Sequence, residues 1–499
     1  MDKEKIKKIL TIENLLCFFI VICPLLDVSS FLFRDFFKTN FSISTIIRPI
    51  IPIFAVIYIF FKEKMKPQMF IASMAYFIYA LCHLYIFYRI KSGCSYGNEI
   101  REIQYLINYT FMIMNLFIYI QIFFWKTNEK SKNDRILMLS KIKKAVLISL
   151  TIYIVLIYIS LLTGTSTYTY SEEKIGYKGW FESGNSLGTI IILSLFMVLP
   201  MMKKENKTYI RIWAFMITVL SGGYLTTTIG TRTGLLGFCI VIASYIILNI
   251  LYNLVQKGKL NKKVVIIGTI VFIVAGVTII FVGSKTIDRR KQLKDKESEI
   301  YDYMLGEDSH VTGDTLAIVE KIKQGQMDEA YMPESMQRAY LDLYNQANKE
   351  NVSNTNMRRL QFIYHSNLIK EQNNIPMLLF GNGYMTHYYE MIFEMEVPAF
   401  LYNFGVIGFF MYFMPFMTIG IYGTYIMIKK FKLSNIEFAM SILGLWFAIA
   451  ISFLSGYTFF NSSSMMIIIA LCVAIVYEIR EISDCEIKIY NPEKQNRRN

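Results

Sequence analysis

This 499-residue chain has little charge and almost no histidine. Charged residues make up 18% of the sequence and histidine occurs four times, whereas soluble domains usually carry roughly 25% charged residues. The chain also lacks DxD, HExxH, Walker and GxSxG motifs. These absences argue against a nucleotide-sugar transferase that uses a DxD-bound metal, and against an ATP-driven pump.

Cysteines are too few and too scattered to form a framework. There are seven, none of them in a CxxC pair, and most lie within apolar stretches. Neither a disulfide scaffold nor a zinc site is therefore expected. The sequence predicts no bound metal and no cofactor.

Long hydrophobic runs are abundant. Hydrophobic residues make up 54% of the chain, and the mean hydropathy is +0.38. A run of about 20 apolar residues can cross the ~30 Å hydrocarbon core of a bilayer as a helix, and a soluble protein cannot bury many such runs. We predict an all-α polytopic membrane protein with about twelve transmembrane helices, at residues 12–30, 43–61, 68–88, 105–125, 145–163, 185–202, 209–229, 233–254, 264–283, 399–428, 435–457 and 462–478.

The net charge of +14 reports the orientation of these helices rather than a nucleic-acid partner. With the N-terminus inside, the inner segments carry 30 basic and 13 acidic residues, and the outer segments carry 22 and 25. An excess of Lys and Arg marks the cytoplasmic side. We therefore predict a multi-pass plasma-membrane protein with both termini in the cytoplasm, in contact with lipid and not with nucleic acid.

One polar region interrupts the apolar pattern. Residues 284–398 contain 13 basic and 18 acidic residues and no apolar run, and a loop of that size is usually functional. Helices are expected at 314–323 and 332–349. The predicted organisation is transmembrane helices 1–9 at 1–283, one large extracellular loop domain at 284–398, helices 10–12 at 399–478, and a cytoplasmic tail at 479–499.

Two arginines at the predicted outer surface are candidates for binding phosphate. Arg232 lies in the turn Gly230-Thr231-Arg232-Thr233-Gly234, where small residues and free backbone N–H groups suit an anion. Arg48 stands at the outer start of the second predicted helix. The alternative for both is a cationic side chain that anchors its helix at the interface.

The predicted loop domain contributes a second group of candidates. Arg358 and Arg359 could clamp a diphosphate bidentately, or could be a solvated pair. Glu394 and Glu396 lie at the lip of the membrane, where partial burial would suit a general base. His387 is a possible accessory acid or base.

The predicted helices have almost no charge at their centres, which argues against a transport path through the bilayer.

Several segments of the chain occur in the order found in one family. The chain resembles the O-antigen ligase/polymerase superfamily, in the form found in Gram-positive exopolysaccharide and capsule gene clusters. The resemblance covers nearly the whole chain. It is carried by Asp27, Arg48, the GWFESGNSLG segment at 179–188 that includes Asn185, Pro200, the turn at 230–234, FGNGY at 380–384, EME at 394–396 and NFGVIG at 403–408.

The resemblance implies a glycosyltransferase-C-like helical fold and a metal-independent glycosyltransferase in the cell envelope. The donor would be a glycan on undecaprenyl or another polyprenyl diphosphate, and a hydroxyl of an acceptor glycan would attack it. Arg232, Arg48 and one of Arg358 or Arg359 would stabilise the leaving diphosphate. Glu394 is the first choice for the base and Glu396 the second, with His387 and Asn185 as accessory residues.

Two features of the resemblance stay open. Many relatives carry a His eleven residues before the Gly that is Gly405 here, and this chain has Glu394 at that position. The favoured activity is polymerisation of lipid-linked repeat units, and the alternatives are a ligase for a finished glycan and a non-enzymatic flippase. Flippase or chain-length-regulating proteins are possible partners.

Overall fold

The computed structural model describes residues 11–39, 42–63, 67–91, 99–125, 132–171, 173–205, 207–257, 266, 270, 283–292, 311, 313–329, 332–350, 352, 356–383, 391, 393–454 and 458–490. The structure is 84% helical. Its elements are α2 (Ile12–Phe37), α3 (Ile43–Tyr58), η1 (Ile59–Glu63), α4 (Pro67–Lys91), α5 (Glu99–Ile120), η2 (Gln121–Trp125), α6 (Lys132–Leu162), β1 (Thr167–Tyr170), β2 (Ile175–Gly179), α7 (Gly184–Val198), α8 (Met201–Lys204), α9 (Thr208–Gly223), η4 (Tyr224–Thr228), α10 (Arg232–Lys257), α13 (Gly313–Lys323), α14 (Glu334–Glu350), α15 (Met357–Gln372), α16 (Ile375–Phe380), α17 (Glu396–Lys429), α18 (Ile436–Leu454) and α19 (Ser462–Tyr490).

The predicted all-α polytopic membrane class is confirmed. Within the described part of the chain, ten helices are long and apolar enough to cross a membrane. The predicted span at 209–229 forms α9 and η4 but is not among these ten, and the predicted span at 264–283 lies almost wholly outside the described residues. The count of twelve helices therefore stays a prediction.

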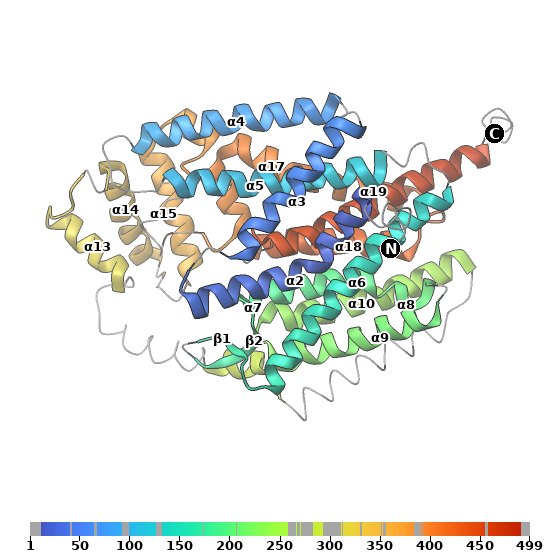
Figure 1. Ribbon diagram of the computed structural model, residues 1–499. Helices are drawn as coiled ribbons and strands as arrows, with labels where there is room; N and C mark the ends of the chain where they lie inside the picture. The colour runs from blue at the N-terminus through green and yellow to red at the C-terminus, as the bar shows by residue number, and fades with distance from the viewer. Residues whose placement is uncertain are drawn as a thin grey trace.

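The loop region has its own hydrophobic core, separate from the core of the helix bundle. Side chains of α13, α14 and α15 form this second cluster, and α13 and α14 lie where helices were expected. Figure 1 shows these three helices at one end of the bundle, opposite the C-terminus. We call this the loop-domain end. The predicted domain boundaries and the side of the membrane on which this end lies stay predictions.

A short hairpin at the loop-domain end is the one described departure from all-helical structure. Strands β1 and β2 pair antiparallel, with Thr167 opposite Gly179 and Tyr170 opposite Ile175. Lys174, directly before β2, takes a positive φ of 51°, as turn residues do. Gly176, within β2, has a φ of 68°, and a Cβ there would lie 2.3 Å from the Ile229 carbonyl oxygen. The hairpin was not predicted from the sequence.

Two glycine-containing segments interlock where the loop domain meets the bundle. Gly405 interrupts α17 with a φ of 70°, and Gly381 follows α16 with a φ of 89°. The backbone N–H groups of Asn382 and Gly383 donate to carbonyl oxygens within α17, at 3.0 and 2.9 Å. Because the two backbones touch, no side chain fits between them.

A buried histidine–glutamate pair supports this junction from the bundle side. His83 of α4 and Glu102 of α5 are fully buried, with Nε2 2.7 Å from a Glu102 carboxyl oxygen. His83 Nδ1 lies 2.6 Å from the Phe380 carbonyl oxygen. That carbonyl can only accept, so Nδ1 carries a hydrogen. The pair therefore links α4 and α5 to the chain just before Gly381.

Substituting Gly381 tests this junction. In Gly381→Ala the new Cβ would lie 2.2 Å from the Asn403 carbonyl oxygen, and the backbone conformation, with a φ of 89° and a ψ of 166°, adds about 1–3 kcal/mol of strain. We expect the variant to accumulate poorly in membranes and to melt at a lower temperature in detergent. Gly325→Ala is the matched control, because Gly325 also has a positive φ of 66° but nothing lies within 4 Å of the added Cβ. Equal melting temperatures for the two variants would contradict the interlocked packing.

Candidate functional site

Arg48 forms an ion pair at the loop-domain end of the bundle. Its guanidinium donates to the Asp27 carboxylate of α2 and to the hydroxyls of Ser462 and Ser463 at the start of α19. Asp27 also accepts from Ser463 at 2.9 Å and from Tyr153 of α6. Four helices therefore meet at this pair.

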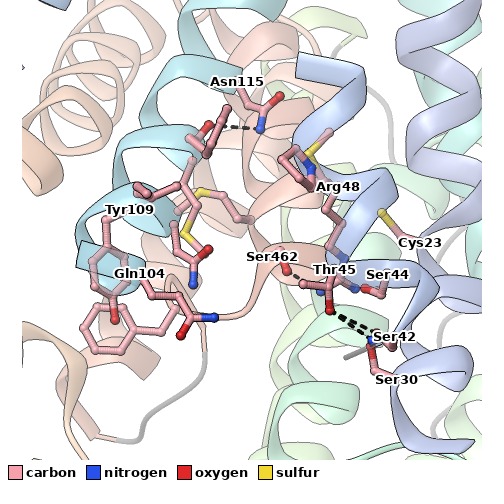
Figure 2. A pocket seen from close by; sticks show the side chains of 18 of the residues that line it. Cys23, Ser30, Ser42, Ser44, Thr45, Arg48, Gln104, Tyr109, Asn115 and Ser462 are labelled. Atoms are coloured by element: carbon pink, nitrogen blue, oxygen red, sulfur yellow. Dashed lines mark hydrogen bonds between the residues drawn. The ribbon is translucent and has the colours of Figure 1, made fainter. Parts of the chain in front are cut away.

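Two cavities, of about 470 and 400 Å³, open beside the Asp27–Arg48 pair. Both are lined by Ser30, Arg34, Arg48 and Glu182, so they adjoin each other. Arg34 pairs with Glu182 at 3.3 Å. Figure 2 shows the larger cavity, with Tyr109 and Asn115 of α5 on one side and Arg48 of α3 on the other.

Arg232 is the first residue of α10 and does not line either cavity. The Thr231 hydroxyl caps the helix by accepting from the Gly234 N–H at 3.1 Å, as helix N-caps commonly do. The turn is held against the hairpin, since a Cβ on Gly230 would lie 3.2 Å from the Gly176 Cα. The Arg232 side chain is exposed.

The structure places a second arginine, which the sequence analysis missed, beside Arg232. Residues 285–292 are helical, and Thr286 donates to the Thr231 carbonyl at 3.3 Å. One turn further on, the Arg289 guanidinium carbon lies 3.3 Å from the centre of the Tyr170 ring of β1. Burial raises the pKa of the Tyr170 phenol and Glu173 adds to the rise, while the charges of Arg289 and Arg232 oppose it.

Arg232 and Arg289 differ from the other candidate arginines in their charge balance. Neither forms an ion pair with any residue that the structure describes. By contrast, Arg48 pairs with a carboxylate, as do Arg358 and Arg359. Arg232 at the start of α10 and Arg289 next to the hairpin thus have a positive charge that is available to an anion.

The structure brings Arg358 and Glu394 together. Arg358 Nε lies 3.2 Å from a Glu394 carboxyl oxygen, and both side chains are exposed. Arg359 points to a different acid, Glu350, at 3.0 Å. The two neighbouring arginines therefore do not form one clamp in this structure, and Arg358 instead orients the carboxylate predicted to be the base.

Glu396 has the contacts of a structural anchor. Its side chain is buried, and its carboxylate accepts the backbone N–H groups of Thr458, Phe459 and Phe460 at 2.5–2.8 Å. These bonds hold the segment before α19 against the start of α17. A base needs an oxygen free for an incoming proton, so this geometry favours anchoring over the catalytic role predicted for Glu396.

The remaining predicted residues lie elsewhere. Asn185 is in the first turn of α7, next to Ser186, which lines the smaller cavity. His387 lies outside the described residues. His365 of α15 is buried, which lowers its pKa to about 4, and its Nε2 faces the Met391 carbonyl oxygen at 2.6 Å. His365 is therefore neutral near pH 7 and donates to that carbonyl.

Residues 10–481 match the family model described as O-antigen ligase like membrane protein. The chain belongs to this family. No curated protein matches it. The matched range covers every candidate residue above. Membership supports a membrane glycan transferase or ligase role, and this O-antigen ligase-like protein is therefore expected to act on lipid-linked glycans.

The two glutamates of the O-antigen ligase-like protein can be separated by matched substitutions. Glu396→Gln removes a buried carboxylate that accepts three backbone N–H bonds, so it should destabilise the fold by about 3 kcal/mol. Glu394→Gln removes an exposed carboxylate and should keep the melting temperature of the purified protein. If Glu394 is the base, the turnover of this variant falls by about 10²–10⁴-fold.

Glycan transfer by both variants is measured alongside their melting temperatures. A stable but inactive Glu396→Gln, together with an active Glu394→Gln, would reverse the two assignments.

Proposed function

We propose that this protein polymerises the repeat units of a surface polysaccharide outside the membrane. A hydroxyl of the acceptor glycan attacks the anomeric carbon of a glycan carried on a polyprenyl diphosphate. The bond between that carbon and the diphosphate oxygen breaks, and the lipid diphosphate leaves with the bonding electrons. The base, for which Glu394 is the first candidate, takes the hydroxyl proton.

Two arginines that pair with no carboxylate among the described residues carry this proposal: Arg232 and Arg289. A leaving diphosphate gains negative charge in the transition state, so cations that face it there lower the barrier. Arg232 and Arg289 have that charge available among the described residues, and the Arg289 guanidinium carbon lies 3.3 Å from the centre of the Tyr170 ring. We assign the diphosphate to these two residues, without a need for a metal ion.

The other predicted phosphate ligands have a weaker claim. Arg48, Arg358 and Arg359 each already balance a carboxylate, and a phosphate would have to compete with that partner. Their part in binding the diphosphate stays a prediction. A ligase would use the same chemistry with another acceptor, and the experiment below distinguishes the two.

Cells that lack the gene provide the test, by mass spectrometry of their polyprenyl-linked glycans. If the protein is a polymerase, single repeat units accumulate on the outer leaflet. Long lipid-linked chains would instead identify a ligase. Units that stay on the inner leaflet would contradict both and identify a flippase.

Complementation of the same cells tests the arginine assignment. Arg232→Ala and Arg289→Gln should each restore polymer about 10- to 100-fold less well than the wild type, the loss expected for a charge-assisted hydrogen bond. Arg290→Gln is the matched control. Arg290 is exposed on the same helical segment, and its substitution removes the same charge. Equal loss in Arg289→Gln and Arg290→Gln, at equal amounts of protein in the membrane, would remove Arg289 from the site.

A further inference from the structure

Among the described residues, each cation that lines the larger cavity already pairs with a carboxylate. The two cations that line it are Arg34 and Arg48. Arg34 pairs with Glu182, and Arg48 pairs with Asp27. A diphosphate entering this cavity would meet the Glu182 carboxylate in its lining, and it would have to compete for Arg48 with Asp27, which lines the adjoining smaller cavity. The charge balance therefore suits a neutral polar ligand better than an anion.

Side-chain amides give this cavity its polar character. Gln104, Asn108 and Asn115 all line it, and their spacing of four and then seven residues places them on one face of α5. Gln104 and Asn108 are exposed, and neither hydrogen-bonds to another described residue. An unpaired amide that faced hydrocarbon would cost several kcal/mol, so these amides suit a water-filled or ligand-filled space.

Asn115 is the third amide in this lining. The Asn115 side chain donates to the Phe111 carbonyl at 2.9 Å, whereas its own carbonyl oxygen is buried without a partner. Buried polar atoms of this kind normally have a hydrogen-bond partner. Figure 2 shows Gln104 and Asn115 on the side of the cavity opposite Thr45.

Aromatic rings complete the lining. Tyr105, Tyr109 and Phe460 line the cavity, and the Tyr109 and Phe460 ring centres are 4.7 Å apart. A sugar ring presents an apolar C–H face and a rim of hydroxyls. Aromatic faces next to amide groups match both parts, and a cavity of about 470 Å³ falls in the range of small-molecule sites.

We infer that this cavity is a subsite for the sugar units of the glycan substrate, held by Gln104 and Asn108. This inference rests on the proposed function and deepens it, because it gives sugar and diphosphate separate positions.

The smaller cavity continues from the larger one to Ser186 and Leu187 of α7. The next residue, Gly188, packs close to the Thr231 hydroxyl, beside Arg232. Sugars in the two cavities would therefore extend toward the arginine pair.

The test uses the full-length protein purified in nanodiscs and measures binding rather than turnover. The probes are the cells' own repeat-unit oligosaccharide released from its lipid, the same unit still on its lipid, and bare undecaprenyl diphosphate. The double variant Gln104→Ala/Asn108→Ala should bind the oligosaccharide about 5- to 100-fold more weakly, the range for two neutral hydrogen bonds. It should bind bare undecaprenyl diphosphate like the wild type. Arg289→Gln should bind bare undecaprenyl diphosphate more weakly than the wild type and should bind the lipid-free oligosaccharide like the wild type.

Ile103→Ala is the control variant, because Ile103 is exposed on α5 but lines neither cavity. Unchanged oligosaccharide binding in the double variant would overturn the subsite. So would an equal loss in Ile103→Ala, or weaker binding of bare undecaprenyl diphosphate in the double variant. If the lipid-free unit binds, the subsite recognises a free glycan end, as an acceptor presents it. If only the lipid-linked unit binds and the double variant weakens it, the subsite holds the donor's sugar.

Failure of the inference and failure of the proposed function give different results. A wild-type protein that binds no oligosaccharide in either form contradicts the subsite. If it still binds bare undecaprenyl diphosphate through Arg289, the proposed function stands. The opposite case combines two results: the double variant loses oligosaccharide binding, and deletion of the gene causes no lipid-linked glycan to accumulate. These results support the subsite and refute the proposed function.

Discussion

The ion pair between Asp27 and Arg48 organises the loop-domain end of the bundle. Each charge would be costly to bury alone in a membrane protein, and the two charges balance each other, with hydrogen bonds from or to the hydroxyls of Tyr153, Ser462 and Ser463. Among the described residues, the buried Arg48 Nε has no partner. The pair fixes α2, α3, α6 and α19 relative to each other, and the two cavities lie against it. Its position therefore determines where polar space can exist among the apolar helices.

Charge balance then separates the parts of the candidate site. Around the cavities, cations are matched by carboxylates and the lining is rich in amides and aromatic rings. At the hairpin and the start of α10, Arg232 and Arg289 have no acidic partner among the described residues. An enzyme that transfers sugars from a lipid diphosphate needs both environments: a neutral one for sugars and a cationic one for phosphate.

Hydropathy predicted the membrane helices because a bilayer imposes length and apolar composition on each span separately. The sequence could not show which charged residues are structural and which are available for catalysis or binding. Glu394 and Glu396 are two positions apart and look alike, and only the segment 458–460, about sixty residues later, makes Glu396 a buried anchor. Arg289 lies in a run of charges, and its position over Tyr170 depends on where a four-residue strand, 119 residues earlier in the chain, packs. Such contacts are long-range and leave no local signal.

A structure of the protein with undecaprenyl diphosphate, determined by electron cryomicroscopy in nanodiscs, tests the central claim most directly. The claim is that the chain binds the diphosphate with Arg232 and Arg289, which pair with no carboxylate in the part of the chain that the structure describes. It predicts phosphate oxygens within hydrogen-bond distance of Arg232 and Arg289, with the Asp27–Arg48 pair intact. A diphosphate bound to Arg48, with Asp27 displaced, would contradict the claim.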